Sequence, residues 1–273
     1  MKYAAWSTDK NNLLESSSGG IFFEMAKKVC EEGGYVVGVL MDGIKAKYVI
    51  SKEIETIKKM RGSKYIPSNP ANVIRQMKNI KELLLFVGLP CHVEAVKKEC
   101  NTKNIILCDL KCHGLPKNGE FEKHIEKIKE GRNIKTIRFR DKKAGWDDGV
   151  SCISLIIKFS DGEVYDEHDE YLKNYMKKSI LREACKKCKR KQVGDITIGD
   201  FWGVPPKVKN KMGTSIVIIN TKKGKEFFDS IETIVKKKPR AYHYFNMESI
   251  KKYLFCSIEK AGLIVPIKKL LKQ

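Results

Sequence analysis

Two short apolar runs joined by a helix-like segment constrain the fold of this chain more than any other feature. Residues 83–87 read Leu-Leu-Leu-Phe-Val and residues 105–110 read Ile-Ile-Leu-Cys-Asp-Leu, with a helix-like stretch at 92–99 between them. Continuous apolar runs of this length are typical of strands buried on both faces. A strand, a helix and a second strand within about 28 residues form a βαβ unit, whose strands lie parallel. The chain is therefore predicted to contain a parallel sheet of the α/β class.

The segments before and after this unit differ in the pattern of helices and strands that they predict. Helices are predicted at 21–32, 51–59, 71–82 and 121–130, and strands at 35–40 and 46–50. Later in the chain, the pattern predicts antiparallel strands at 136–140, 151–159 and 163–165, a helix at 171–183, strands at 196–199 and 215–220, a helix at 224–235, and lysine-rich C-terminal helices. The fold class is thus α/β: a mostly parallel sheet with helices in the N-terminal half, an antiparallel β portion and C-terminal helices. A boundary near residue 130 divides the chain into residues 1–130 and 131–273, unless the two parts form one continuous domain.

Composition excludes several classes of protein. A hydrophobic content of 42% in 273 residues is enough for a core, which excludes general disorder. No apolar run approaches the ~18–20 residues of a spanning helix, so we expect no membrane insertion. The N-terminus lacks the apolar stretch of a signal peptide. We therefore expect a cytoplasmic protein whose reduced cysteines serve as metal or redox ligands rather than in disulfides.

The charge is strongly positive, but its pattern does not favour nucleic acid. Lysine and arginine number 54 against 33 acidic residues, a net charge of +21, and only eight of the basic residues are arginine. Nucleic-acid binders favour arginine and concentrate their charge on one face, whereas here lysine is spread over nearly every amphipathic segment. We expect no nucleic-acid partner, and interpret the charge mainly as a lysine bias, with a minority of lysines serving an anionic cofactor or partner.

Four of the nine cysteines lie where the fold could gather them. Cys91 follows the first buried strand and Cys112 follows the second, at the strand ends where open α/β sheets bind ligands. Cys185 and Cys188 form a CxxC pair, which can place two sulfurs on one metal or cluster. Four thiolates suit either a [4Fe–4S] cluster or a tetrahedral zinc, and the spacing does not decide between them. The other five lie in helix-like or strand-like segments and are interpreted as small buried hydrophobes: Cys30, Cys100, Cys108, Cys152 and Cys256.

Two further segments have the composition of anion-binding loops. Residues 16–20, Ser-Ser-Ser-Gly-Gly, lead directly into the helix predicted from residue 21, and a helix N-terminus favours negative charge. Residues 61–65, Arg-Gly-Ser-Lys-Tyr, combine two cations, a hydroxyl and an aromatic ring. On sequence alone, an ordinary helix start is the favoured interpretation of the first segment, and a solvated loop is an equal alternative for the second. His113, beside Cys112, has a cluster-bonding, a proton-shuttling and a purely structural interpretation.

Taken in order, these motifs and their neighbours resemble the coenzyme F420 hydrogenase/dehydrogenase beta-subunit family. The motifs lie at 16–22, 61–65, 88–91, 112–116, 139–146, 185–188 and 195–203. The resemblance implies an iron–sulfur flavoprotein oxidoreductase that transfers electrons between a [4Fe–4S] cluster and FAD. It also implies hydride exchange between the flavin and an organic substrate or the deazaflavin F420.

The resemblance also implies roles for individual residues. The cluster ligands would be Cys91, Cys112, Cys185 and Cys188. The FAD contacts would be Ser17, Ser18, Gly19, Gly20, Arg61, Gly62, Ser63, Lys64 and Tyr65. His113 is the candidate catalytic residue, Asp200 would orient the cluster loop, and Trp146 with Gly145 and Asp141 would shape the wall of the site.

Partners follow from what the sequence lacks. Bacterial relatives often begin with a module of ferredoxin-type cysteine runs, and no such run occurs in these residues. Electrons are therefore expected to come from a separate ferredoxin or electron-transfer subunit, and the flavin's substrate to be a small molecule. The alternative hypothesis is a zinc-stabilised, non-enzymatic binding module that uses the basic surface.

Overall fold

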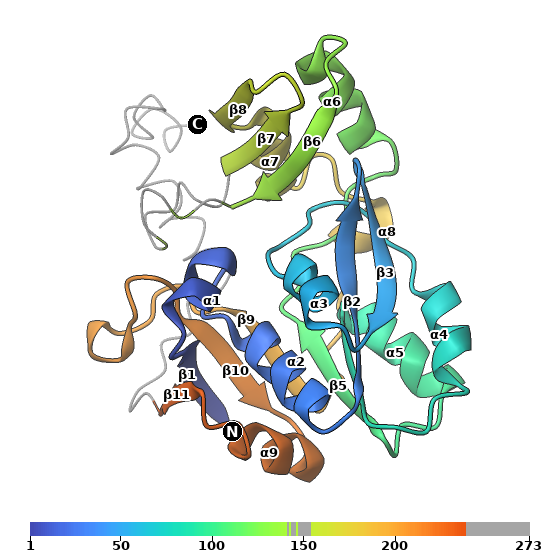
Figure 1. Cartoon of the computed structure of the whole chain (residues 1–273), viewed down its shortest axis with the longest axis vertical. Helices are drawn as coiled ribbons and strands as arrows, with labels where there is room; N and C mark the ends of the chain where they lie inside the picture. Colours follow the sequence, from blue (N-terminus) through green and yellow to red (C-terminus); the bar gives the residue numbers. More distant parts are fainter. Residues whose placement is uncertain (141, 143–145, 147–153, 239–273) are drawn as a thin grey trace, which may run out of the picture.

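A mixed sheet of eight strands forms the centre of the chain (Figure 1). The structure is a computed structural model that describes residues 1–140, 142, 146 and 154–238. The strands, in spatial order, are β11 (Ile234–Lys237), β1 (Lys2–Ser7), β10 (Ser215–Ile219), β9 (Ile196–Asp200), β5 (Ile105–Leu110), β4 (Leu84–Gly88), β2 (Tyr35–Asp42) and β3 (Lys45–Ser51). Neighbours among β9, β5, β4 and β2 pair in parallel, and the flanking pairs are antiparallel. The predicted α/β class is confirmed, with a sheet that is parallel at its centre and antiparallel at both edges.

The predicted βαβ unit is present as β4, α5 (Pro90–Glu99) and β5. The two strands pair in parallel register from Leu84 with Ile105 to Gly88 with Asp109. Every residue of β4 is buried, which explains the uninterrupted apolar run, because side chains on both faces of the strand meet helices. The register also brings the ends of β4 and β5 to the same edge of the sheet.

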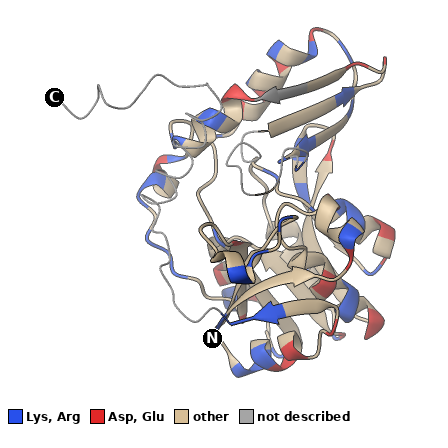
Figure 2. Cartoon of the chain, turned by 90° about the vertical axis from the view of Figure 1, so that its left-hand side faces the viewer, with Lys and Arg blue, Asp and Glu red and all other residues tan. Residues whose placement is uncertain are grey.

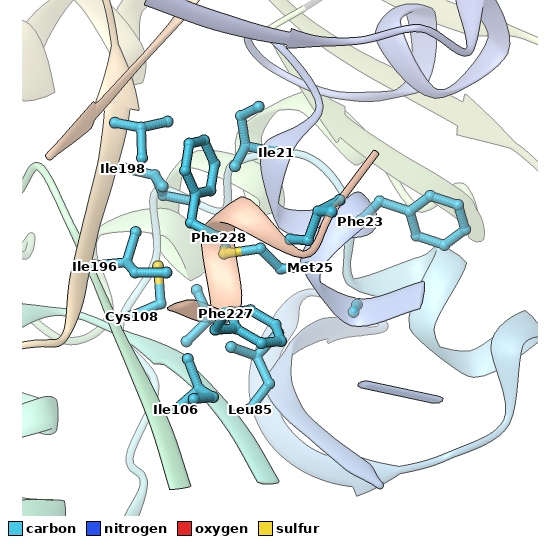
Figure 3. Packing of buried hydrophobic residues seen from close by; sticks show 14 of the residues in the cluster. Ile21, Phe23, Met25, Leu85, Ile106, Cys108, Ile196, Ile198, Phe227 and Phe228 are labelled. Carbon is cyan, nitrogen blue, oxygen red and sulfur yellow. The ribbon is translucent and has the colours of Figure 1, made fainter. Parts of the chain in front are cut away.

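Helices cover both faces of this sheet, and alternate residues of β4 contact them. Leu85 and Val87 belong to a core with α2 (Ile21–Glu31), α3 (Ile54–Met60) and α9 (Lys222–Asp229) (Figure 3). Leu84 and Phe86 belong to a second core with α4 (Ala71–Met77) and α5. Helices therefore cover both faces of the sheet, and the ends of its strands remain available for a site. A further short helix, α1 (Lys10–Glu15), follows β1.

A smaller antiparallel sheet stands apart from the large one (Figure 1). It consists of β6 (Ile134–Phe139), β7 (Ser154–Phe159) and β8 (Val164–His168), and it shares a core with α6 (Glu120–Lys129) and α7 (Glu170–Met176). The antiparallel portion that the sequence predicts is this sheet. The division expected near residue 130 does not separate the two sheets, because β9, β10 and β11 return to the large one.

Several element boundaries differ from prediction. β1 was not expected at all; it pairs with β10, so Lys2 lies opposite Ile218. The helix predicted at 171–183 ends at Met176 as α7, close to Lys178 with its left-handed φ of 64°, and a separate short helix, α8 (Glu183–Lys186), begins at the last predicted residue. The helix predicted at 224–235 ends at Asp229, and its last residues form the edge strand β11.

Other expectations fall on residues that the structure does not describe. Cys152, Cys256 and the predicted C-terminal helices lie outside the described residues, as do Asp141 and Gly145. Within the described part of the chain, no helix has both the length and the apolar composition to cross a membrane.

Candidate functional site

A cavity of about 560 Å³ lies at the carboxyl edge of the parallel strands. Its size is within the ~300–1,000 Å³ typical of small-molecule and cofactor sites. The two loops that the sequence singled out, 16–20 and 61–65, both line it, and so do residues 110–116 after β5 and 198–202 at the end of β9. Segments far apart in the chain thus meet at the sheet edge that the βαβ unit indicated.

The loop at 16–20 is pressed against the large sheet by its glycines. A Cβ on Gly19 would lie 2.4 Å from the carbonyl oxygen of Ala5 in β1, so only glycine fits there. Gly20 is the N-cap of α2 with a left-handed φ of 76°. It lines the cavity together with Ile21 and Phe22. The amino end of α2, which favours negative charge, therefore borders the cavity.

The loop at 61–65 is fastened to the first loop. The amide of Ser63 donates a 2.6 Å hydrogen bond to the hydroxyl of Ser17. The guanidinium of Arg61 lies 4.9 Å from the ring centroid of Phe23 in α2. Tyr65 packs against Tyr175 at a ring-centroid distance of 4.9 Å. The two predicted loops therefore form one continuous wall.

Lys64 has a structural role that the sequence did not indicate. Its buried ammonium donates to the carbonyl oxygens of Met60, Arg61 and Gly62 at 2.6, 2.7 and 3.0 Å. These carbonyls are at and just beyond the end of α3, so the side chain caps that helix. Burial lowers the pKa of Lys64 to about 7. Its contacts favour capping over phosphate binding, and leave Arg61 as the cation of this loop.

A second lysine braces the other loop, and sequence reasoning missed it. The ammonium of Lys142 donates to the carbonyl oxygens of Leu13, Ser18 and Met212 at 2.7, 2.6 and 2.8 Å. Burial, followed by the charge of Arg140, lowers the pKa of Lys142 to about 7. The only signal in the sequence was the position of Lys142 within the motif at 139–146.

The four predicted cluster cysteines sit on three segments that the fold draws together. Cys91 is the second residue of α5, directly after β4, and Cys112 lies two residues beyond β5. Cys185 lies in α8 and Cys188 follows it. The segment after Cys112 is bridged to the segment before Cys185, because the amide of Arg182 donates to Leu115 O at 2.9 Å.

The ionisation of Cys112 responds to the other three thiols. The pKa of Cys112 is raised to about 11, first by burial among protein atoms and then by the thiols of Cys91, Cys185 and Cys188. Cys112 is nonetheless reached by solvent through the cavity that it lines. Within the described ranges, no three His, Cys, Asp or Glu side chains are placed to hold one metal ion.

The donor set fits a thiolate-bound metal centre. Cys112 lines the cavity, the other three cysteines lie near enough to act on its ionisation, and thiolate ligands select zinc or iron–sulfur clusters. Burial, and after it the neighbouring thiols, disfavour ionisation of Cys112 and raise its pKa. A bound cation would reverse that preference, because metal coordination deprotonates thiols.

His113 lines the cavity beside Cys112. Its Nε2 atom lies 3.2 Å from the carbonyl oxygen of Tyr175, and the two rings pack at a centroid distance of 5.2 Å. The Tyr175 hydroxyl in turn donates to Gly114 O at 2.9 Å. The imidazole is thus held in one orientation at the cavity wall.

Two groups of residues at the cavity wall were only partly predicted from the sequence. Arg140 donates to Asp200 Oδ2 at 2.6 Å and lies over the ring of Trp202 at 5.5 Å. Trp146 stacks in parallel on Trp202 at 5.2 Å, and its Nε1 donates to Ser17 O at 3.2 Å. Trp146 therefore supports the wall from behind, while Asp200 contacts Arg140.

Asp109 and Tyr48 were missed altogether. The Asp109 carboxylate is fully buried in β5 and accepts from the amides of Val193 and Gly194 at 2.6 and 2.9 Å, which fixes the segment after the CxxC pair. The hydroxyl of Tyr48, at the cavity wall, lies 2.8 Å from Nδ1 of His92. A carboxylate inside an otherwise apolar strand was the available signal for Asp109, and Tyr48 gave none.

Comparisons with known proteins give the family and the fold. A family profile described as the C terminus of the coenzyme F420 hydrogenase/dehydrogenase beta subunit matches residues 81–239, and the corresponding N-terminal profile matches residues 2–75. No curated protein matches the sequence. One solved structure, a xenon derivatization of the F420-reducing [NiFe] hydrogenase complex from Methanosarcina barkeri, contains a chain with the same fold. It is 18% identical, with a TM-score of 0.63 over 96% of this chain and 91% of that chain.

Proposed function

The chain belongs to the coenzyme F420 hydrogenase/dehydrogenase beta-subunit family, and from that premise we propose that it is an iron–sulfur flavoprotein oxidoreductase. In this proposal it binds FAD in the cavity and a [4Fe–4S] cluster beside it. Its task is to carry electrons between the two and to exchange a hydride with a small organic substrate. The observation that carries the proposal is that both predicted anion-binding loops and Cys112 line one cavity.

The flavin fits the chemistry of the cavity wall. The diphosphate of FAD needs positive potential and amide donors, which the amino end of α2 and Arg61 supply. We assign FAD contacts to Ser17, Ser18, Gly19, Gly20, Arg61, Gly62, Ser63 and Tyr65, with Lys64 holding the second loop in place. FAD, when bound, supplies the hydride chemistry, while the protein positions it and excludes water.

Four cysteines supply the number and type of ligand for the proposed cluster. We propose Cys91, Cys112, Cys185 and Cys188 as its thiolate ligands, the number that a [4Fe–4S] cluster requires. The cluster, when bound, supplies single-electron transfer. Asp109, which holds the segment after Cys188, and Arg182, which links the segments of Cys112 and Cys185, keep the ligands in register.

His113 is the proposed proton carrier at the cavity. Tyr175 O can only accept a hydrogen bond, so Nε2 of a neutral His113 carries the ring proton. Nδ1 is then the ring atom that can accept a proton. The imidazole can then take up a proton at Nδ1 next to the flavin. The substrate class stays open in this proposal: deazaflavin F420, which the solved relative's complex reduces, is one candidate among small organic molecules.

Anaerobic purification followed by iron, sulfide and flavin analysis tests this function. We expect a brown protein with four iron, four sulfide and one flavin per chain, and with broad visible absorbance. A colourless protein with stoichiometric zinc and no flavin would overturn the proposal and support the zinc-stabilised binding module instead.

A further inference from the structure

Five basic residues surround the exposed cysteine of the CxxC pair. Between residues 186 and 191 no acidic residue occurs, and every side chain in this segment is exposed, including that of Cys188. We call these five residues the basic rim: Lys186, Lys187, Lys189, Arg190 and Lys191. Lys186 pairs with Glu183 and Arg190 pairs with Glu94. Lys187, Lys189 and Lys191 have no ion-pair partner among the described residues.

Net charge alone would not select this surface. Lysine and arginine occur on helices and strands throughout the described structure, with acidic residues among them (Figure 2). The surface pairs on α3, α6 and α9 illustrate this, since each joins a lysine to a glutamate or aspartate on the same helix. The basic rim differs because three of its charges are left uncompensated side by side next to a thiol of the candidate cluster.

The segment that carries the rim is held against the protein. The ion pair between Arg190 and Glu94 fastens it to α5, and Lys97 in the same helix donates to Val193 O at 3.0 Å. The buried carboxylate of Asp109 binds the amides of Val193 and Gly194. The exposed lysines are therefore presented from a fixed backbone, which favours recognition of a complementary surface.

We propose that the basic rim is the docking surface for a small acidic electron-carrier protein. This inference rests on the proposed function, because a carrier must come close to Cys188 only if the cysteines hold a redox centre. Charged, wet and small contacts are typical of weak electron-transfer encounters, in which opposite charges speed and orient the association. Flexible lysines, rather than forked arginines, suit such a transient contact with carboxylates.

Binding of an oxidised plant-type [2Fe–2S] ferredoxin, used as the acidic probe, tests the proposal without turnover. The rim variant is Lys187→Glu/Lys189→Glu. Its matched control is Lys81→Glu/Lys103→Glu, two exposed lysines just before β4 and β5, at the opposite edge of the sheet. Both variants change the net charge by the same amount. We expect the rim variant to lose roughly tenfold or more in affinity and in association rate, and the control to bind like the wild type.

The salt dependence of ferredoxin binding, and binding to other anionic partners, complete the test. Wild-type affinity should fall steeply between about 50 and about 300 mM salt, because exposed charges are screened over that range. Equal losses in both variants would mean attraction by overall charge and would overturn the proposal. Loss of binding to phosphatidylglycerol vesicles or duplex DNA in the rim variant, with ferredoxin binding unchanged, would overturn it too. Iron and flavin analysis of the same samples separates this result from a failure of the proposed function, since binding can be measured on a protein with neither.

Discussion

Two buried ammonium groups set the shape of the cavity wall at the scale of single residues. Lys64 closes the end of α3 through the carbonyls of the loop at 61–65, and Lys142 joins Ser18 O to Met212 O. Each lysine directs its charge to backbone oxygens rather than to a ligand. Hydrogen bonds from a charged donor are stronger than neutral ones, so these two side chains are well suited to hold flexible loops in one conformation.

Lys64→Met should flatten the dependence of stability on pH. Burial lowers the pKa of Lys64 to about 7 in the folded chain, whereas an unperturbed lysine titrates near ~10.4. Between these values the unfolded chain binds more protons, so the free energy of unfolding rises with pH by up to about 1.3 kcal/mol per pH unit. Removing Lys64 removes that contribution. Urea unfolding at several pH values between about 7.5 and about 9 measures the slope.

Lys59→Met is the matched control for this prediction, because Lys59 is exposed on α3, the helix that Lys64 caps. It should keep the wild-type slope. A wild-type slope in Lys64→Met as well would mean that the surrounding carbonyls keep the ammonium charged throughout, against the expected cost of its burial.

The role of Lys64 could not be predicted from its neighbours in sequence. A lysine between a glycine-containing loop and a tyrosine resembles a phosphate-binding cation, and the same residue type serves equally well to cap a helix. The choice depends on how the chain turns after Met60, which a one-dimensional pattern does not contain. Cys108 is the opposite case, since its place inside an apolar run was enough to predict its complete burial.

At the scale of elements, the start of α2 is the most constrained junction. Gly20 has a φ of 76°, and a Cβ there would lie 2.8 Å from Nδ2 of Asn12. Asn12 itself donates to Gly20 O and to the buried carboxylate of Glu24. The glycine is therefore required both by its backbone conformation and by the polar network against which it packs.

Gly20→Ala and Gly33→Ala separate these two requirements. Both glycines have a φ of 76°, but a Cβ on Gly33 would meet no atom within 4 Å. Gly33→Ala should cost roughly 1 kcal/mol of stability from backbone strain alone and keep its flavin. Gly20→Ala should cost roughly 2–4 kcal/mol, because overpacking adds to the strain, and lose most of its flavin. Urea unfolding and the flavin-to-protein absorbance ratio measure both effects; equal flavin content in the two variants would contradict the proposed place of α2 at the cofactor.

Local patterns predicted the central elements and the edge strand β3, but missed β1 and β11. The composition of residues 83–87 and of the helix after them indicates burial without reference to distant segments, so β4, α5 and β5 were predictable. β1 and β11 are strands because each finds a partner elsewhere in the sheet, as when Ala4 pairs with Ile216 on one side and Lys237 on the other. Such distant pairing leaves little trace in a short window of sequence, especially for strands only four to six residues long.

At the scale of the whole molecule, the cavity lies between the large sheet and residues that pack with the core of the small sheet. The large sheet contributes Gly88 and Ile198, and the core of the small sheet contributes Ile66. A site built this way depends on the relative position of both sheets. Residues 65–66 pack in the core of the small sheet, and the segment 112–116 joins β5 of the large sheet to α6 beside the small one. Sequence motifs indicated each of these segments. Only the βαβ unit, however, gave a physical reason to place Cys91 and Cys112 side by side.

Iron content of single-cysteine variants tests the central claim most directly. Cys188→Ser removes a proposed ligand that is exposed, so little packing is lost, whereas Cys30→Ser alters a half-buried cysteine in α2. Each variant is purified without oxygen, and iron, sulfide and flavin are measured per chain. We predict four iron per chain in the wild type and in Cys30→Ser, and a large loss of iron and sulfide in Cys188→Ser. Iron and sulfide in Cys188→Ser equal to the wild type would contradict the assignment of the four cysteines to a cluster.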